Sequence, residues 1–332
     1  MQKIKYDKLF DKAVSLLKNG TVSCVLGWKK GEFSYDITPA VFYNEEELKR
    51  DFVWNDFCGA NMSKYLVSMT KKCEGKILVF LKPCDTYSFN QLLTEHRFDR
   101  EKVYAVGVSC DGMADIEKIK GICGEGISSI DTDSEKIKVR TIYSDDEILV
   151  DKQDILAERC KNCKSKKHVA YDELLGDEGE VISSKRFDEV ERIEKMTPDE
   201  RFAFWQNELS KCIRCNACRD VCPACTCEKC VFDNPSSGVE NKSPANSFEE
   251  KMFHIIRAFH VAGRCTDCGE CSRVCPQNIP LHLLNRKFIK DINEFYGEYQ
   301  AGDEVGQRCP TVDYKLDDLE PGEVFDRGEN DA

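Results

Sequence analysis

The pattern of hydrophobic positions predicts a parallel α/β unit in the first half of the chain. Residues 76–82 form a short apolar run that stops at a Pro-Cys-Asp turn, as a buried strand does. Residues 85–98 have a helical pattern, and residues 103–109 form a second apolar run that stops at Cys110. This strand–helix–strand spacing predicts a βαβ unit with both strand ends on one edge of a sheet, where open α/β sheets bind ligands.

Two segments in the second half of the chain have the periodicity of helices. Residues 198–211 begin with proline and acidic residues, which favour a helix start. Their apolar positions recur at three- and four-residue steps: Phe202, Trp205 and Leu209. Residues 248–262 repeat this layout after Ser247, a candidate cap. One face of this second helix carries Phe253, Ile256 and His260.

The chain contains enough cysteine for either disulfides or metal sites, because 20 of its 332 residues are cysteine. Disulfide-rich chains are typically small and secreted, whereas this N-terminus has charges where a secretory signal needs an apolar stretch. The longest compact apolar run, 77–81, is far too short to cross a bilayer. A net charge of −12 argues against a nucleic-acid partner. We therefore expect a cytoplasmic protein of anaerobic metabolism, without a transmembrane segment, whose cysteines bind metal.

A cysteine motif occurs twice in the helical half of the chain. The first copy consists of Cys212, Cys215, Cys218 and Cys222, followed by proline. The second copy consists of Cys265, Cys268, Cys271 and Cys275, also followed by proline. This spacing is typical of bacterial two-cluster ferredoxins, in which three cysteines of a run bind one 4Fe–4S cluster and the fourth binds the other. Zinc ribbons, the alternative, use separated cysteine or histidine pairs.

The two-cluster rule assigns the eight cysteines to two crossed sets. Cluster 1 is expected to bind Cys212, Cys215, Cys218 and Cys275. Cluster 2 is expected to bind Cys265, Cys268, Cys271 and Cys222. Residues 223–264 separate the copies and contain a predicted helix, which resembles the α-helical ferredoxin domains of heterodisulfide-reductase and succinate-dehydrogenase iron–sulfur subunits. His254 and His260 are expected on the surface or in the packing of this helix rather than as ligands.

Three further cysteines, Cys225, Cys227 and Cys230, follow the first copy of the motif. Three thiols do not complete a tetrahedral site. They either bind a further cluster or a zinc ion with an unidentified fourth group, or pack beside the first cluster. The sequence leaves these alternatives open.

The first half of the chain contains another set of four cysteines. Cys160 and Cys163 form a pair that alone would suit a redox dithiol or half of a zinc site. Cys84 and Cys110 lie at the two predicted strand ends, where they can converge on one sheet edge. Together the four thiols match the ligand count of a third 4Fe–4S cluster.

The residues around these four cysteines resemble a known family. The stretches 82–85, 107–112 and 160–163 are similar to motifs in the beta subunits of deazaflavin-coenzyme-reducing hydrogenases and related formate dehydrogenases. The resemblance covers about residues 50–175 and implies a 4Fe–4S cluster on Cys84, Cys110, Cys160 and Cys163. With the C-terminal motifs, the chain also resembles sulfhydrogenase beta and anaerobic sulfite reductase A subunits.

The family resemblance also implies a flavin, FAD, in the first domain. Residues 121–126 contain three glycines but do not match the GxGxxG dinucleotide fingerprint, and we expect a loop there. The remaining cysteines are Cys24, Cys58, Cys73, Cys123 and Cys309. Cys58 is the one expected to be able to replace a cluster ligand, and the other four are expected to be ordinary thiols.

These observations predict a four-part organisation. We expect an α/β cluster-binding domain at 1–175, a charged linker at 176–197, an α-helical ferredoxin-like domain with two 4Fe–4S clusters at 198–295, and an acidic tail at 296–332.

The predicted function is electron transfer in a multi-subunit anaerobic oxidoreductase. The chain has no catalytic triad and no phosphate-binding glycine loop, so the clusters would carry the chemistry and the chain itself is expected to be non-catalytic. Expected partners are a dehydrogenase, a hydrogenase, a heterodisulfide-reductase-like subunit or soluble ferredoxin. The alternatives are a flavin-containing subunit that reduces a nicotinamide or deazaflavin coenzyme, and a zinc-stabilised scaffold.

Overall fold

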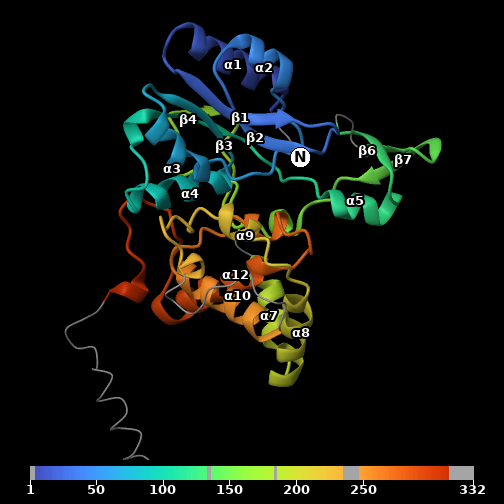
Figure 1. Ribbon diagram of the computed structural model, residues 1–332, viewed down its shortest axis with the longest axis vertical. Helices are drawn as coiled ribbons and strands as arrows, with labels where there is room; N and C mark the ends of the chain where they lie inside the picture. The colour runs from blue at the N-terminus through green and yellow to red at the C-terminus, as the bar shows by residue number, and fades with distance from the viewer. Residues whose placement is uncertain (1–3, 133–135, 183–184, 235–246, 314–332) are drawn as a thin grey trace, which may run out of the picture.

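The computed structural model describes residues 4–132, 136–182, 185–234 and 247–313. Figure 1 shows a sheet flanked by helices in the upper part of the molecule and a helical unit below it. The main sheet has the order β2-β1-β3-β4-β8, and its β1–β2 pair is antiparallel while its other pairs are parallel. Its strands are β1 (Cys24–Lys30), β2 (Ile37–Phe42), β3 (Ile77–Leu81), β4 (Val103–Val108) and β8 (Glu173–Leu175).

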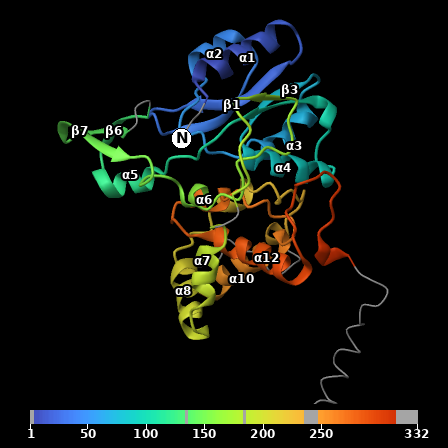
Figure 2. The same ribbon diagram turned by 180° about the vertical axis from the view of Figure 1, so that it is seen from behind.

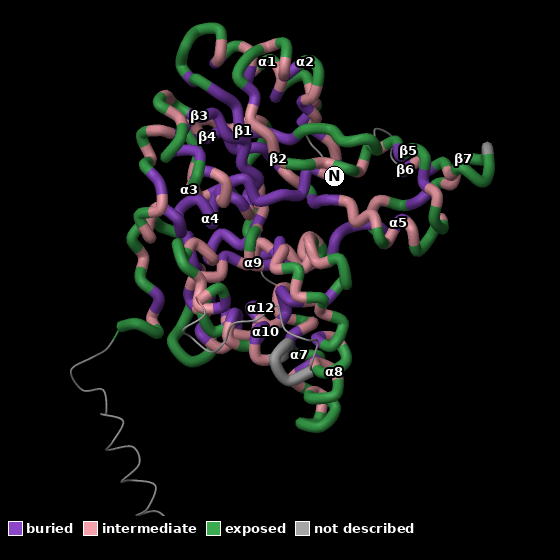
Figure 3. Tube along the Cα trace, viewed as in Figure 1, coloured by how far each residue is buried: buried purple, intermediate pink, exposed green. Residues whose placement is uncertain are grey.

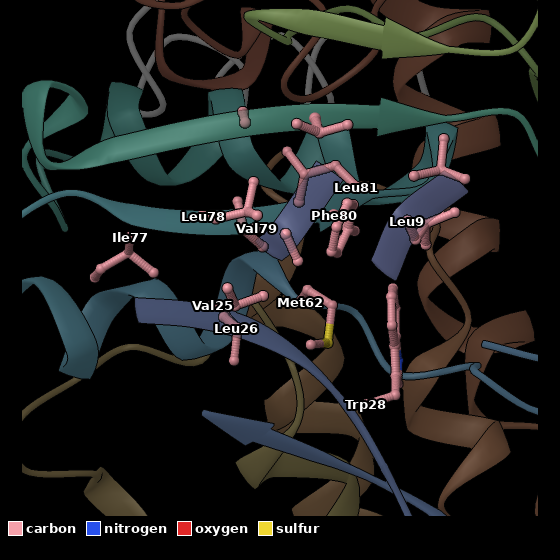
Figure 4. Close-up of a cluster of buried hydrophobic side chains, with 14 of the residues drawn as sticks. Leu9, Val25, Leu26, Trp28, Met62, Ile77, Leu78, Val79, Phe80 and Leu81 are labelled. Carbon is pink, nitrogen blue, oxygen red and sulfur yellow. The ribbon is translucent and has the colours of Figure 1, made fainter. Parts of the chain in front are cut away.

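Helices cover both faces of this sheet, as Figures 1 and 2 show from opposite sides. Helices α1 (Tyr6–Lys18) and α2 (Glu45–Asp51) lie on one face, and α3 (Ser63–Lys72) and α4 (Pro83–Thr94) on the other. A strand covered on both faces has no polar side, which explains why all five residues of β3 are apolar and buried. Figure 4 shows β3 side chains among those of β1, and Figure 3 shows the buried positions concentrated in this region.

The predicted βαβ unit is confirmed. Strand β3, helix α4 and strand β4 correspond to the segments 76–82, 85–98 and 103–109. The two strands are parallel neighbours, with Leu81 opposite Gly107 at their carboxyl ends. Helix α4 starts immediately after β3 because Pro83 fixes its first turn and the Asp85 carboxylate accepts a hydrogen bond from the Lys82 amide at 3.1 Å.

A second, smaller sheet follows β4 and projects to one side in Figure 1. It consists of the antiparallel strands β5 (Ile127–Asp131), β6 (Lys136–Thr141) and β7 (Ser144–Asp151). Helix α5 (Ile116–Cys123) packs on it and buries Ile119 with Ile137 and Val139. The glycine-containing segment 121–126 is therefore the last turn of α5 and the connection to β5.

The second half of the chain is helical, as the sequence predicted. Its helices are α6 (Glu158–Lys161), α7 (Asp188–Glu194), α8 (Pro198–Ser210), α9 (Ala217–Asp220), α10 (Ser247–Val261), α11 (Glu270–Arg273) and α12 (Leu281–Tyr296). Short 3-10 turns lie at Val231–Asp233 and Pro310–Val312. The described helices include none with the length and apolar character needed to cross a membrane.

Helices α8 and α10 match the two predicted helices, but some residues of their predicted inward faces are exposed. Leu209 is buried, but Phe202 is 61% exposed, because the start of α8 extends away from the rest of the molecule (Figure 1). On α10, Phe253 is buried and His260 is exposed. Ser247 is the first residue of α10, and its side chain lies outside the described part of the chain.

The segments expected as linker and tail contain ordered contacts. Within 176–197, α7 packs Val190 and Ile193 against Leu283 of α12. Within the tail segment, Tyr299 is buried, and its hydroxyl donates to the carbonyl oxygen of Gly263 at 2.8 Å. Most of the acidic end, residues 314–332, lies outside the described residues.

Candidate metal centres

The four cysteines of the first half of the chain line a single pocket. Cys84 is the second residue of α4, and Cys110 follows β4, so the parallel pairing of β3 and β4 brings both to one sheet edge. Cys160 lies on α6, and Cys163 follows it. All four contribute to the pocket wall. The juxtaposition expected from the strand ends is therefore present in the structure.

Buried cations surround this N-terminal cysteine pocket. Lys82 is 1% exposed, lies 2.9 Å from the Asp85 carboxylate, and donates to the carbonyl oxygen of Ala60 at 2.8 Å. Burial would lower the pKa of Lys166, but the charges of all four pocket cysteines act on its ammonium and raise that pKa overall. One ammonium group therefore lies within electrostatic reach of the whole set of four thiols.

Two thiols of this pocket, those of Cys84 and Cys110, resist ionisation on their own. Burial, followed by the charge of Asp85, raises the pKa of Cys84 well above its usual value. Burial and the neighbouring Cys160 raise the pKa of Cys110 to about 11. Thiolates in such a setting require a compensating positive charge, which an iron–sulfur cluster supplies through its iron.

The two cysteine motifs in the second half of the chain have the same backbone conformation. In the first copy, Arg214 and Asn216 have positive φ angles of 54° and 62°. In the second copy, Asp267 and Gly269 hold the equivalent positions with 57° and 69°. Each copy continues into a one-turn helix, α9 or α11. The sequence repeat is thus also a structural repeat, in which left-handed residues curl the chain between consecutive cysteines.

The fourth cysteine of each copy lies against the other copy. Burial raises the pKa of Cys218 to about 12, and the neighbouring thiols that contribute are Cys271 and Cys275 of the other copy and Cys212 of its own. Cys215, the remaining residue predicted for cluster 1, is exposed. Three of the four residues of the cluster 1 set, Cys212, Cys218 and Cys275, therefore pack in one cluster of side chains.

The second set is centred on Cys222. Burial is the main cause that raises the pKa of Cys265 to about 12 and of Cys271 to about 11, and it raises the pKa of Cys268 well above its usual value. The charge of Cys222, from the first copy, acts on each of these three thiols. Cys222 of the first copy therefore lies within electrostatic reach of these three cysteines of the second copy.

These donor sets fit polynuclear iron–sulfur clusters. Among the described residues, no group of three or more His, Cys, Asp or Glu side chains surrounds a point where a single metal ion could bind. A 4Fe–4S cluster differs from a single ion because each of four cysteines binds a different iron. Its ligand sulfurs consequently stand further apart than those of a mononuclear site.

Two buried arginines next to these sets were not identified from the sequence. Arg257 on α10 is 3% exposed, and its guanidinium donates to the carbonyl oxygen of Cys218 at 3.0 Å. Arg159 on α6 donates to the carbonyl oxygen of Cys268 at 3.1 Å. In the sequence, Arg257 lies four residues after Phe253 on an apolar helix face, and Arg159 lies directly before Cys160. These positions are the signals from which the two arginines could have been identified.

The remaining candidate residues are also located. Cys58 is fully buried in the core, and its thiol lies 3.7 Å from the carbonyl oxygen of Val53. Cys24 and Cys73 have their sulfurs 3.8 Å apart. His254 is 2% exposed, and burial, followed by the charge of Arg257, lowers its pKa to about 3.

Comparisons with known proteins extend these observations. A model of the 4Fe-4S dicluster domain family matches residues 208–279. The beta subunit of the F420-dependent formate dehydrogenase of Methanocaldococcus jannaschii is 24% identical, over 83% of this chain and 86% of that one. The beta subunit of F420-dependent formate dehydrogenase 1 of Methanococcus maripaludis is 26% identical, over 89% of this chain and 92% of that one.

A chain in the structure of the F420-reducing NiFe hydrogenase complex of Methanosarcina barkeri aligns with a TM-score of 0.37 and 15% identity, over 62% of this chain and 89% of that one. The family resemblance inferred from the cysteine motifs is confirmed by the two formate dehydrogenase relatives. The chain carries a 4Fe-4S dicluster domain and is similar, over most of its length, to beta-type iron–sulfur subunits.

Proposed function

We propose that this chain is the iron–sulfur electron-transfer subunit of a multi-subunit oxidoreductase, relaying single electrons between a catalytic partner and an acceptor. The relatives are subunits of formate dehydrogenases by name, which favours a formate dehydrogenase catalytic subunit as the partner. Hydrogenase and heterodisulfide-reductase-like subunits, and soluble ferredoxin, are the other partners to test.

The proposed ligands are three sets of four cysteines. Cluster 1 takes Cys212, Cys215, Cys218 and Cys275, cluster 2 takes Cys265, Cys268, Cys271 and Cys222, and cluster 3 takes Cys84, Cys110, Cys160 and Cys163. Bound 4Fe–4S clusters supply one-electron chemistry. The chain supplies the thiolates and places buried cations beside them.

The observation that carries this proposal is a wall shared by two cysteine sets. The N-terminal cysteine pocket is also lined by Asp267 and Cys268 of the second motif copy. Arg159 lies at this boundary and donates to carbonyl oxygens on both sides, at Gly59 (3.0 Å) and Cys268 (3.1 Å). Because electron tunnelling weakens steeply with distance, two redox sites that share a wall are suited to exchange electrons.

Buried positive charge supports the same role. Lys82, Arg159 and Arg257 are between 1% and 8% exposed and lie next to the cysteine sets. A fixed cation close to a cluster stabilises the extra electron of the reduced state, because the interaction is strong where water is excluded. A purely structural metal site gains nothing from such tuning of a redox potential.

The test is cluster content after anaerobic purification. We expect about twelve iron atoms per chain from these three sites, or about eight from the two dicluster sites alone, with matching sulfide. Cys84→Ser should remove about four iron atoms and leave the dicluster paramagnetic signals unchanged. Cys123→Ser, at the end of α5, is the matched control and should leave the content unchanged. About four iron atoms in the wild-type chain, or zinc in place of iron, would overturn the proposal.

Flavin extraction from the same sample tests the main competing function. The family resemblance implies FAD, and a flavoprotein would release flavin and reduce a nicotinamide or deazaflavin coenzyme as an isolated chain. Flavin together with that activity would replace the electron-relay proposal by a catalytic one. We expect the isolated chain to accept and donate electrons without coenzyme reduction.

A further inference from the structure

A second cavity contains the three cysteines that the proposed function does not use. Cys225, Cys227 and Cys230 all line this cavity, which has a volume of about 550 Å³. Its other walls come from α3, through Lys64, and from the end of α10, through Arg257 and His260. The cavity is separate from the N-terminal cysteine pocket, with which it shares no lining residue. We call it the three-cysteine cavity.

Cations outnumber carboxylates in the lining of the three-cysteine cavity, which contains Lys64, Arg219, Arg257 and Arg264 but also Asp220, Glu228 and Asp233. Arg219 and Arg264 also line it, but each is paired with a carboxylate, Asp233 at 2.7 Å and Glu95 at 2.6 Å. Lys64 and Arg257 instead donate to backbone carbonyl oxygens, those of Cys225 at 2.5 Å and Cys218 at 3.0 Å. A carbonyl group does not neutralise a cation, so these two side chains leave positive charge at the cavity wall.

One of these cations also has an unused hydrogen-bond donor. Arg257 is 3% exposed, and its Nε has no hydrogen-bond partner among the described residues. A buried donor without a partner destabilises the fold, because it has lost its hydrogen bonds to water. Such a group in the wall of a cavity therefore indicates a ligand with acceptor atoms, such as sulfide or thiolate sulfur.

The thiols select the kind of ligand. Cysteine thiolates are soft ligands that bind zinc, copper(I) and iron–sulfur clusters. A single zinc ion fills only a small part of a cavity of about 550 Å³ and prefers four closed protein ligands. An iron–sulfur cluster held by three thiolates is larger, carries net negative charge, and presents sulfide acceptors to a donor such as Arg257.

We propose that Cys225, Cys227 and Cys230 hold an additional iron–sulfur cluster in the three-cysteine cavity. Three thiolates would leave one iron of a 4Fe–4S cluster without a cysteine ligand, and His260 is the imidazole among the residues that line the cavity. Cys227 is exposed, so the cluster lies near the surface. The site is a cofactor site in its own right, and it does not depend on the electron-relay role proposed above.

The proposed site adjoins cluster 2 at Cys222 but is distinct from it. Cys225 shares a side-chain hydrogen bond with Cys222 and packs in the same cluster of side chains. Cys222 packs with Cys265 of the second motif copy and also acts on Lys64 through its charge. The charge of Cys227 acts on Lys64 and Arg264, and that of Cys230 acts on Arg219. The two sets thus meet at Cys222 and Cys225 and extend in different directions.

The first test is the triple variant Cys225→Ser/Cys227→Ser/Cys230→Ser, purified anaerobically as the full chain. We expect it to contain about four iron and four sulfide fewer than the wild type. The dicluster paramagnetic signals should remain. The double variant Cys73→Ser/Cys123→Ser, whose cysteines lie outside the cavity lining, is the matched control and should keep the wild-type content. Unchanged iron and sulfide in the triple variant overturn the proposal, as does the loss of one zinc atom.

A single substitution covers the case in which the triple variant does not fold. Cys227 is exposed, so Cys227→Ser leaves the core intact. We expect this variant to lose the same iron and sulfide, or to keep a smaller cluster with an altered paramagnetic signal. Wild-type content with a wild-type signal overturns the proposal.

The two proposals fail in different ways. If the wild-type chain contains about four iron atoms and the triple variant contains none, the additional cluster is supported and the three clusters of the relay are rejected. A wild-type chain that keeps all of its iron in the triple variant and loses about four atoms in Cys84→Ser supports the relay and rejects the additional cluster.

Discussion

Arg159 and Glu270 form a buried ion pair that joins the α/β unit to the helical unit. Arg159 lies on α6, directly before Cys160, and Glu270 is the first residue of α11. Their side chains are 8% and 1% exposed. Glu270 also pairs with Arg273 at 2.8 Å. The ion pair therefore fixes the boundary at which the N-terminal cysteine pocket meets Cys268.

The Glu270→Gln variant should lose substantial stability. It leaves the buried Arg159 guanidinium without its carboxylate, and removing one partner of a buried pair typically destabilises a protein by about 3–5 kcal/mol. Arg273→Gln is the matched control, because Arg273 is 34% exposed and Glu270 keeps Arg159. We expect the control to lose less than about 1 kcal/mol. Anaerobic thermal unfolding of both variants measures this, and equal losses would contradict the assignment of the buried pair as the stronger contact.

Arg257 should set the redox potentials of both dicluster sites. Its guanidinium lies close to Cys218 of the first set and to Cys222 and Cys271 of the second, and their charges act on it. Removing a fixed cation makes each cluster harder to reduce. At an effective dielectric constant of about 20, we expect Arg257→Gln to lower both potentials by about 50–100 mV, equivalent to about 1–2 kcal/mol.

Two controls separate charge from packing in the Arg257 experiment. Arg257→Lys keeps the charge and should restore most of the potential. Arg201→Gln removes a half-buried arginine that donates to carbonyl oxygens of Glu194 and Met196, away from the cysteines, and should leave both potentials unchanged. Redox titration followed by electron paramagnetic resonance provides the measurement. Unshifted potentials in Arg257→Gln would show that Arg257 acts on the fold alone.

Local signals explain what could be predicted from the sequence. The β3–α4–β4 unit follows from two apolar runs and a helix between them, and parallel pairing then brings Cys84 and Cys110 together. The repeated cysteine spacing is likewise matched by a repeated backbone conformation in the two motif copies. At the left-handed positions, Asn216 and Gly269 are residues that favour this conformation. Arg214 and Asp267 adopt it because the chain must curl between two cysteines.

Contacts between distant segments explain what could not be predicted. Arg159 and Glu270 meet only because α6 and α11 pack together, and no periodicity in the chain encodes that contact. The small β5–β6–β7 sheet consists largely of polar residues, so its alternation is weak. The tail segment packs partly through its backbone, as where Asn90 donates to the carbonyl oxygen of Asp303. Such a bond leaves no trace in the type of the accepting residue.

His168 should make stability depend on pH. The residue is 3% exposed, with Nε2 3.2 Å from the carbonyl oxygen of Val108 and Nδ1 3.5 Å from Glu178. Burial lowers its pKa below the usual value of 6.5, although Glu178 acts in the opposite direction. Below about pH 6.5 the unfolded chain therefore binds a proton more readily than the folded chain, and stability falls as the pH falls.

Removing this imidazole should flatten the pH dependence. We expect the melting temperature of His168→Gln to change less than that of the wild type between about pH 7.5 and about pH 6. His96→Asn is the control, because His96 is exposed and asparagine tolerates its positive φ angle of 52°. Parallel profiles for His168→Gln and the wild type would mean that other groups produce the slope.

Gly302 should be essential for the packing of residues 299–309 against α4. Its φ angle is +77°, and a Cβ atom there would lie far inside the contact distance of the Tyr87 carbonyl oxygen. Gly297 has a φ angle of +94° and no neighbour within 4 Å of a built Cβ, so Gly297→Ala isolates the backbone strain of about 1–2 kcal/mol. Gly302→Ala adds a backbone clash that α4 cannot relieve, and we expect it to destabilise the chain by about 3 kcal/mol or more. Thermal unfolding compares the two variants, and trypsin cleavage at Arg308 should accelerate in Gly302→Ala only. Equal losses of stability in both variants would mean that the segment moves aside without loss of its contacts.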